Sequence, residues 1–235
     1  MNTLIRYIFA LSLSVIVGKA AAQVGEHRSD FAIGANAGVT MNTMNFQPTI
    51  KQSQLIAPTF GLTARYISEK YFTTICGVQL ELNYANLGWK ELIEDGSGNT
   101  FHRNHQYIQM PILMQLGWGY EQKGCKFLFE AGPQFGYNFG MSEVYGGGEW
   151  NTSHRPNYVV GQYGMEVDNK FDYGIAGGLG VELSTGIGHF LLEARYYYGL
   201  SDVFSNSKKA YFARSANQTI SARFTYLFDI VKTQR

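Results

Sequence analysis

Residues 190–198 have the sequence FLLEARYYY, and this stretch decides the fold. Every second residue from Phe190 to Tyr198 is apolar or aromatic, whereas Glu193 and Arg195 occupy positions between them. Successive side chains of a β-strand point to opposite faces of its sheet, so a period of two indicates a strand. We therefore predict a strand with one apolar face and one face that carries charge.

The same alternation recurs seven more times along the chain. The other segments are 31–41, 60–66, 72–84, 108–120, 127–139, 171–183 and 220–228. The composition agrees, because 15% of the residues are aromatic and 27 are glycine, which favour pleated surfaces and turns respectively. The sequence predicts an all-β protein with eight antiparallel strands.

The connections between these segments alternate in length. Short turns are expected around 68–70, 121–124 and 185–188, and longer connections around 45–57, 94–104, 145–168 and 204–215. Short turns at one end and long loops at the other are typical of an eight-stranded antiparallel transmembrane β-barrel, with short periplasmic turns and longer outer loops. No domain boundary interrupts the pattern, so residues 23–235 are predicted to form one barrel domain.

A soluble, lipocalin-like barrel is the alternative, and it would carry its large apolar residues inside. Here the charged mid-strand residues lie opposite the aromatic face, which favours a membrane barrel with a polar lumen. Four Glu and three Arg nearly balance, as a dehydrated interior requires. The residues predicted to form this structural lumen network are Arg65, Glu81, Glu130, Glu182, Glu193, Arg195 and Arg223.

The first 22 residues are predicted to be a secretory signal peptide. Arg6 precedes an apolar run from Tyr7 to Val17, and cleavage is expected near Ala22. The predicted destination is the bacterial outer membrane.

Charge and cysteine content exclude several classes of protein. The formal net charge of +1 gives no basic surplus for nucleic acid. Cys76 and Cys125 are too few for a disulfide scaffold or a zinc site. No cofactor and no metal are predicted.

Several short motifs resemble the PorT-like outer-membrane β-barrel family of the Bacteroidota, often labelled porin family proteins. The motifs, in family order, are Asn83–Lys90, Tyr107–Pro111, Glu130–Pro133, Phe171–Gly174, Gly178–Glu182, Glu193–Tyr196 and Gly199–Ser201. The resemblance covers nearly the whole of residues 23–235 and implies an outer-membrane barrel. One member of the family resembles a type IX secretion component. The resemblance therefore also implies a secretion-assembly role as one expectation.

The expected lumen is narrow. Eight strands leave an interior just wide enough for side chains to fill, so we predict no open diffusion pore. A narrow channel for small solutes is the runner-up. Six lumen-facing glycines would either leave a local void or permit curvature of the wall. They are Gly132, Gly136, Gly140, Gly174, Gly178 and Gly180.

Enzyme activity at the outer rim is a weaker hypothesis, and no catalytic residue is predicted. A His beside a carboxylate could act as a general base, but no nucleophile motif accompanies these residues. His102 and His105 are also expected on opposite faces of their segment, which does not suit a metal. The candidate rim residues are His102, His105, His154, Glu94, Asp95, Glu149 and Asp168.

The longest predicted loop, Gly146 to Asp168, is the candidate partner-binding loop. It carries Trp150, Tyr158 and Tyr163 among small polar residues. An equally good interpretation is that these aromatic residues pack as an extension of the flanking strands above the membrane. The expected partners are outer-membrane lipid and a secretion-system or surface protein.

Overall fold

The computed structural model describes residues 25–233 except 122, 154, 156–158 and 208–209. The predicted signal peptide, residues 1–22, lies outside the described residues. In the described part of the chain, no helix is long and apolar enough to cross a membrane.

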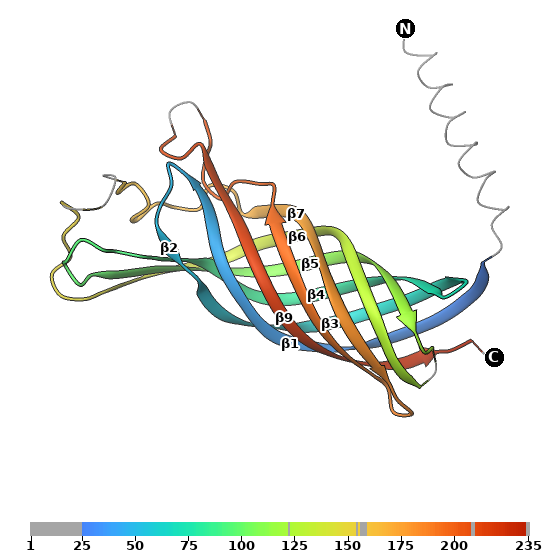
Figure 1. Ribbon diagram of the computed structural model, residues 1–235. Helices are drawn as coiled ribbons and strands as arrows, with labels where there is room; N and C mark the ends of the chain where they lie inside the picture. The colour runs from blue at the N-terminus through green and yellow to red at the C-terminus, as the bar shows by residue number, and fades with distance from the viewer. Residues whose placement is uncertain (1–24, 122, 154, 156–158, 208–209, 234–235) are drawn as a thin grey trace, which may run out of the picture.

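Eight long antiparallel strands form a closed ring (Figure 1). The strands are β1 (Glu26–Gln47), β3 (Leu55–Tyr71), β4 (Thr74–Glu91), β5 (Thr100–Gly119), β6 (Gly124–Gly146), β7 (Phe171–Ser184), β8 (His189–Gly199) and β9 (Arg214–Val231). Neighbours pair in the order β4-β3-β1-β9-β8-β7-β6-β5, and a β4–β5 pairing closes the ring. The short β2 (Gln52–Ser53) pairs with the end of β4. The prediction of an eight-stranded antiparallel barrel is confirmed.

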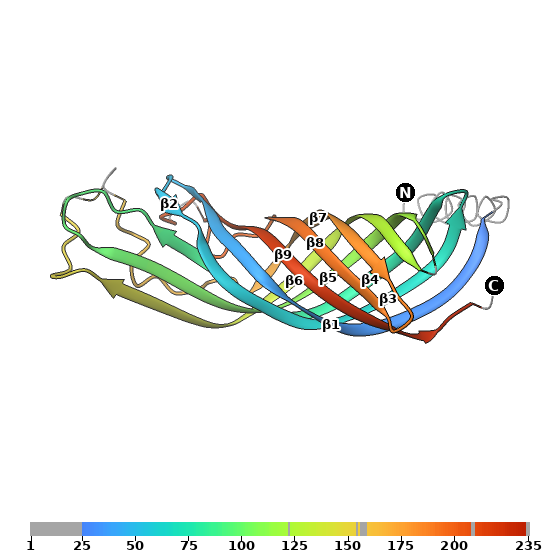
Figure 2. The same ribbon diagram turned by 60° about the horizontal axis from the view of Figure 1, so that its bottom comes forward.

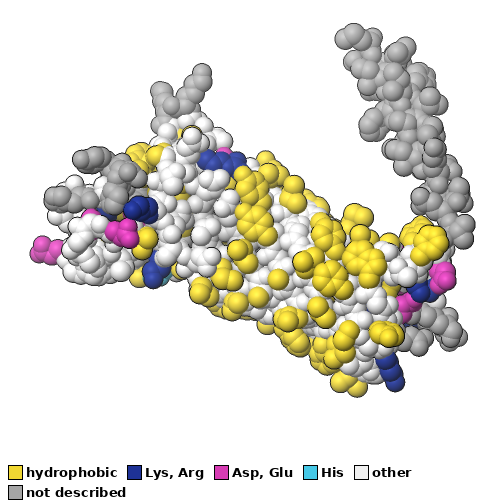
Figure 3. Space-filling model, viewed as in Figure 1, with side chains coloured by type: hydrophobic (Ala, Val, Ile, Leu, Met, Phe, Trp, Pro, Cys, Tyr) yellow, Lys and Arg dark blue, Asp and Glu magenta, His cyan; other side chains and the backbone are white. Residues whose placement is uncertain are grey.

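The two faces of the wall follow the predicted alternation. Large apolar side chains such as Leu62, Met114 and Leu192 are more than half exposed on the outside. Residues between them on the same strands, including Arg65, Gln115 and Glu193, are buried inside. Figure 3 shows the apolar side chains spread over the middle of the outer surface, with charged side chains toward its two ends.

One end of the barrel carries both ends of the described chain and the short turns, and the other carries the long connections (Figure 1). The first turn differs from its prediction around residues 68–70. Strand β3 continues to Tyr71, and the turn lies at Phe72 and Thr73. A register shift between Ile67 and Glu69 marks a bulge in the strand. The polar stretch Ser68–Lys70 resembled a turn in the sequence but lies within the strand, at this bulge.

The outer face changes from apolar to polar at one level near the long-loop end. On β4 and β5, Tyr84 pairs with Ile108, and the next outward pair is Asn86 with Gln106. On β1 and β9, Met41 pairs with Ile220, and Thr43 with Gln218 follows. We call the level marked by these two changes the outer boundary.

Above the outer boundary the two faces exchange character. The inward side chains there include Phe46, Trp89 and Phe101, each at most 3% exposed. Apolar residues face outward next to lipid but inward next to water, so this exchange is the pattern expected where strands leave a membrane. It also explains why β5 begins at Thr100, inside the loop predicted at 94–104.

Candidate functional site

A network of charged side chains occupies the middle of the lumen. The Arg195 guanidinium contacts Glu81 at 2.6 Å and Glu193 at 2.9 Å, and it also pairs with Glu130. Arg223 contacts the other oxygen of Glu81 at 2.8 Å. The structure thus brings five of the seven predicted lumen residues into one group.

Polar neighbours donate further hydrogen bonds to the carboxylates of this group. Gln79 donates to Glu81 at 2.8 Å and to Glu193 at 3.0 Å. Asn83 donates to Glu81 at 2.7 Å, and Thr225 donates to Glu193 at 2.8 Å. Buried carboxylates need several such donors because burial removes their water.

The other two predicted lumen residues form a second group closer to the short turns. Arg65 contacts Glu182 at 2.6 Å. Glu182 also contacts Lys126 at 2.9 Å and His189 at 2.6 Å, and His189 reaches Asp229 at 3.0 Å. Lys126 and His189 were not among the predicted lumen residues, although their inward phase follows from the same alternation that placed Glu130 and Glu193.

Both groups cross the lumen from one wall to the opposite wall. In the ring of eight strands, β8 with Arg195 is four steps from β4 with Glu81 in either direction. The same holds for β3 with Arg65 and β7 with Glu182. Two ion pairs therefore span the interior at different heights, and side chains fill the space between the walls.

The six lumen glycines lie close to neighbouring groups instead of lining a void. A Cβ atom added at any of the six would lie within 3.2 Å of another heavy atom. At Gly132 it would be 2.0 Å from the backbone oxygen of Ile112, and at Gly178 2.4 Å from that of Ala194. These glycines let adjacent strands approach closely, so of the two interpretations the structure favours curvature.

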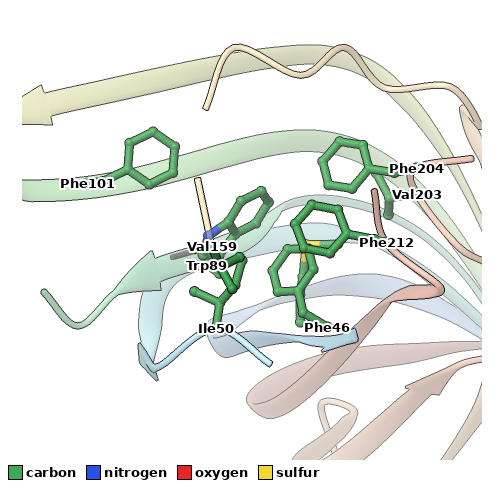
Figure 4. Close-up of a cluster of buried hydrophobic side chains, with 9 residues drawn as sticks. Phe46, Ile50, Trp89, Phe101, Val159, Val203, Phe204 and Phe212 are labelled. Carbon is green, nitrogen blue, oxygen red and sulfur yellow. The ribbon is translucent and has the colours of Figure 1, made fainter. Parts of the chain in front are cut away.

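A cluster of apolar side chains closes the long-loop end above the lumen (Figure 4). We call it the cap. Phe46 packs against Trp89 and Phe212 at centroid distances of 4.9 and 4.8 Å. The cap residues are Met44, Phe46, Ile50, Trp89, Phe101, Val159, Val203, Phe204 and Phe212, all at most 6% exposed. They come from strands and long connections, so the loops fold over the barrel mouth as one packed unit.

The candidate partner-binding residues lie against this cap. Trp150 and Tyr163 are half-buried and pack edge-to-face at 5.0 Å. Trp150 also lies 4.7 Å from the ring of Tyr145 at the end of β6. Tyr158 lies outside the described residues. This packing matches the alternative interpretation of an extension of the flanking strands above the membrane.

Polar contacts attach the 147–170 connection to the strand ends. Arg155 pairs with Asp95 and donates to the Tyr163 hydroxyl at 3.0 Å. That hydroxyl donates to Glu91 at 2.9 Å. Burial raises the pKa of the Glu91 carboxyl, and the hydrogen bond from Tyr163 offsets only part of this increase. Hydrogen bonds from the Ser97 hydroxyl and backbone lower the pKa of Asp95 to about 2.

Arg103 on β5 contacts both the cap and the 147–170 connection. Its guanidinium lies 5.5 Å from the Trp89 ring and 5.3 Å from the Phe204 ring. It pairs with Glu143 at 3.1 Å and donates to the backbone oxygens of Gln162 and Met165. Arg103 was not predicted as a site residue, because its segment was predicted to be a loop.

The rim residues considered for catalysis do not converge. His102 and His105 lie on opposite faces of β5, as their spacing predicts, and His105 is fully buried. Asp95 is engaged by Arg155, and Glu94 contacts Lys51 at 3.1 Å. His154 lies outside the described residues. In the described residues, no three His, Cys, Asp or Glu side chains are arranged to hold a metal ion.

Comparison with known proteins gives remote structural likenesses and one family match. No curated protein matches the chain. Among solved structures, OprG of Pseudomonas aeruginosa is 12% identical to this chain, with a TM-score of 0.42. The match covers 87% of this chain and 98% of the OprG chain. Neisserial surface protein A is 11% identical, with a TM-score of 0.42 and coverages of 84% and 97%. Ail of Yersinia pestis, solved with the heparin analogue sucrose octasulfate, is 10% identical, with a TM-score of 0.39 and coverages of 86% and 99%.

The family match spans most of the chain. Residues 21–205 match the model of the outer membrane protein beta-barrel domain. The closed ring of strands, its apolar outer face and its polar interior are the features that such a domain requires. The chain belongs to the outer membrane protein beta-barrel domain family.

Proposed function

We propose that the protein is a closed, non-enzymatic outer-membrane barrel that binds a protein partner through its long-loop end. Barrels of this class place their short turns in the periplasm and their longer loops outside. The cap and the strand ends beyond the outer boundary would then face the cell exterior. A packed loop end suits binding, because a rigid surface loses little conformational entropy when a partner docks.

The observation that carries the proposal is the pair of cross-lumen contacts, Arg195 with Glu81 and Arg65 with Glu182. A diffusion pore needs a continuous water-filled path, and these contacts occupy the interior at two heights. The cap adds a third barrier of apolar side chains above them. A function at the surface is favoured over transport through the lumen.

The partner class proposed first is a component of a secretion assembly. The motifs that resemble the PorT-like family support this choice, and Asn83–Lys90 lies where β4 leaves the membrane. Pull-down of type IX secretion components with the folded barrel tests it. Failure of the folded barrel to recover any of these components would argue against this partner class.

Single-channel conductance in planar bilayers tests the closed lumen. The refolded protein, with heat-modifiable migration as the folding control, is expected to be electrically silent. Silence that persists when the cap is weakened by Phe204→Ala would support the lumen network as the main barrier. Steady conductance that changes on substitution of Glu193 or Arg195 would instead establish the narrow channel.

A further inference from the structure

The end of β6 forms an open edge of the sheet beyond the outer boundary. Strand β6 pairs with β7 from Gly124 to Tyr137, and Asn138 donates its backbone N–H to Lys170. From there to Gly146 the strand continues beside β5 alone. In the described residues, no backbone hydrogen bond reaches residues 139–146 from the side where β7 would lie. Figure 2 shows this part of β6 along one side of the projecting strands.

The opposite edge of the same projection is covered by the chain itself. Beyond its pairing with β3, strand β4 pairs with β2 through Lys90 and Glu91. Leu92 also donates its backbone N–H to Lys51 at 2.9 Å. Among the residues that the structure describes, the chain thus shields one edge of the projection and leaves the other open.

The backbone groups at the open edge belong to alternate residues. For a strand of given direction, the face on which a residue's side chain lies determines the neighbouring strand toward which its backbone N–H points. Asn138 is buried inward, and its N–H points to the β7 side. Met141, Glu143 and Tyr145 also face inward, since they contact Arg103 or Phe101. Their N–H and C=O groups therefore point to the open edge.

The sequence at this edge lacks two of the usual protections against strand pairing, lysine and proline. Natural edge strands carry Lys, Pro or inward charges that discourage a second strand. Residues 139–146, FGMSEVYG, contain neither Lys nor Pro. The one charged side chain, Glu143, is already held by Arg103 and by the backbone N–H of Gly164.

We propose that residues 139–146 of β6 bind an extended segment of a different polypeptide by strand addition. This proposal rests on the proposed function and deepens it, because it names the binding element and the chemistry of the partner. A strand added at an edge gains affinity from backbone hydrogen bonds and specificity from alternate side chains.

A second copy of this chain fits the edge less well. All copies insert into the membrane in the same direction, so two β6 strands would run parallel. Parallel pairs are slightly less stable per residue than antiparallel pairs. A separate segment at the cell surface is free to pair in the antiparallel direction.

The side chains beside the edge define the partner further. Met141 and Tyr145 are 41% and 44% exposed on the side of the cap and present apolar surface there. Ser142 and Val144 lie on the outer, water-facing side. A matching segment has alternating apolar and polar side chains.

Binding of a synthetic strand to the full-length barrel in lipid nanodiscs tests the proposal. The probe is a fluorescent peptide as long as residues 139–146, with alternating Val and Thr and lysines at its ends. Two further versions of the peptide carry N-methyl groups, one on all Val amides and the other on all Thr amides. Because alternate residues point their N–H groups to opposite edges of a strand, each version blocks one edge of the peptide. We expect the unmodified peptide and only one methylated version to bind. Equal binding of both methylated versions, or no binding of any peptide, would overturn the proposal.

Matched variants locate the site. Proline is tolerated where an N–H faces away from the sheet, so Met141→Pro removes an edge donor while leaving the β5 pairing in place. It should weaken peptide binding by about tenfold, roughly the effect of one lost hydrogen bond. Met141→Leu should bind like the native protein, and equal binding by the proline variant would contradict the proposal.

Hydrogen exchange on the native protein covers the case in which the proline variant does not fold. The amides of Met141, Glu143 and Tyr145 should exchange faster than those of Ser142 and Val144, and the peptide should protect them. Slow exchange of the first three without peptide would show that the edge is already paired and overturn the proposal. A conducting barrel would refute the proposed function whatever the peptide does, whereas a silent barrel that ignores the peptide would refute only strand addition.

Discussion

Arg195 donates a 2.6 Å hydrogen bond to Glu81 on the opposite wall of the barrel. Both side chains are at most 5% exposed, so neither charge is solvated by bulk water. Each therefore depends on the other and on the polar groups around them. The contact holds two strands together that have no backbone pairing with each other.

Removing Arg195 should destabilise the barrel strongly. Arg195→Ala leaves Glu81, Glu130 and Glu193 with fewer donors, and breaking a buried ion pair costs about 3–5 kcal/mol. Urea unfolding in lipid vesicles measures the change in the free energy of unfolding. The control is Lys51→Ala, whose partner Glu94 is exposed, with an expected cost of about 0–1 kcal/mol. Unchanged stability of the Arg195 variant would refute a structural role for the network.

The cap should depend on Trp89. This side chain is fully buried and contacts Phe46, Phe101 and Phe204. Trp89→Ala should cost about 3–5 kcal/mol and speed proteolysis within residues 147–170, because the loops lose the surface that they cover. Phe72→Ala, at a side chain that is 97% exposed, is the matched control and should change neither quantity. Native-like proteolysis of the Trp89 variant would show that the cap holds without it.

The barrel could be predicted from sequence because lipid imposes a simple rule. Between the two membrane boundaries the outward side chains must be apolar, so the alternation around Glu193 and Arg195 already marks the inner face. Placement of the charged residues follows from that phase. Their partners do not, since contacts between β8 and β4 depend on the closure of the whole ring.

The projection and the cap could not be predicted by the same rule. Beyond Ile108 on β5 the outward residues are polar and Phe101 faces inward, so a search for an apolar outer face ends too early. The apolar residues of the cap come from several distant segments. Only the folded loops bring Phe46, Trp89 and Phe212 together.

Asp95 offers a test of the loop contacts by pH. Hydrogen bonds from Ser97 lower its pKa from 3.8 to about 2. A carboxyl group whose pKa is lower in the folded state than in the unfolded state stabilises the fold fully when the pH is above its unfolded-state pKa. This stabilisation is lost as the pH falls through the folded-state pKa. The contacts of Asp95 should therefore persist from neutral pH to about pH 4 and weaken toward pH 2. Carboxyl-carbon NMR titration measures this pKa, and Ser97→Ala should raise it, whereas Ser153→Ala on the neighbouring connection should not.

Charge scanning along β5 should locate the outer boundary. At this boundary the outward-facing side chains change from polar at Gln106 to apolar at Ile108. Met114 lies near the middle of the apolar stretch, which ends around Trp118. An arginine on the lipid face costs about 2–4 kcal/mol near the bilayer midplane and about 0–1 kcal/mol near an interface. Met114→Arg should therefore lower the free energy of unfolding in vesicles far more than Ile108→Arg, and Gln106→Arg should leave it unchanged. Equal costs at all three positions would mean that the apolar stretch does not face lipid. A large cost at Gln106 would place the boundary farther out and bring part of the open β6 edge into the membrane.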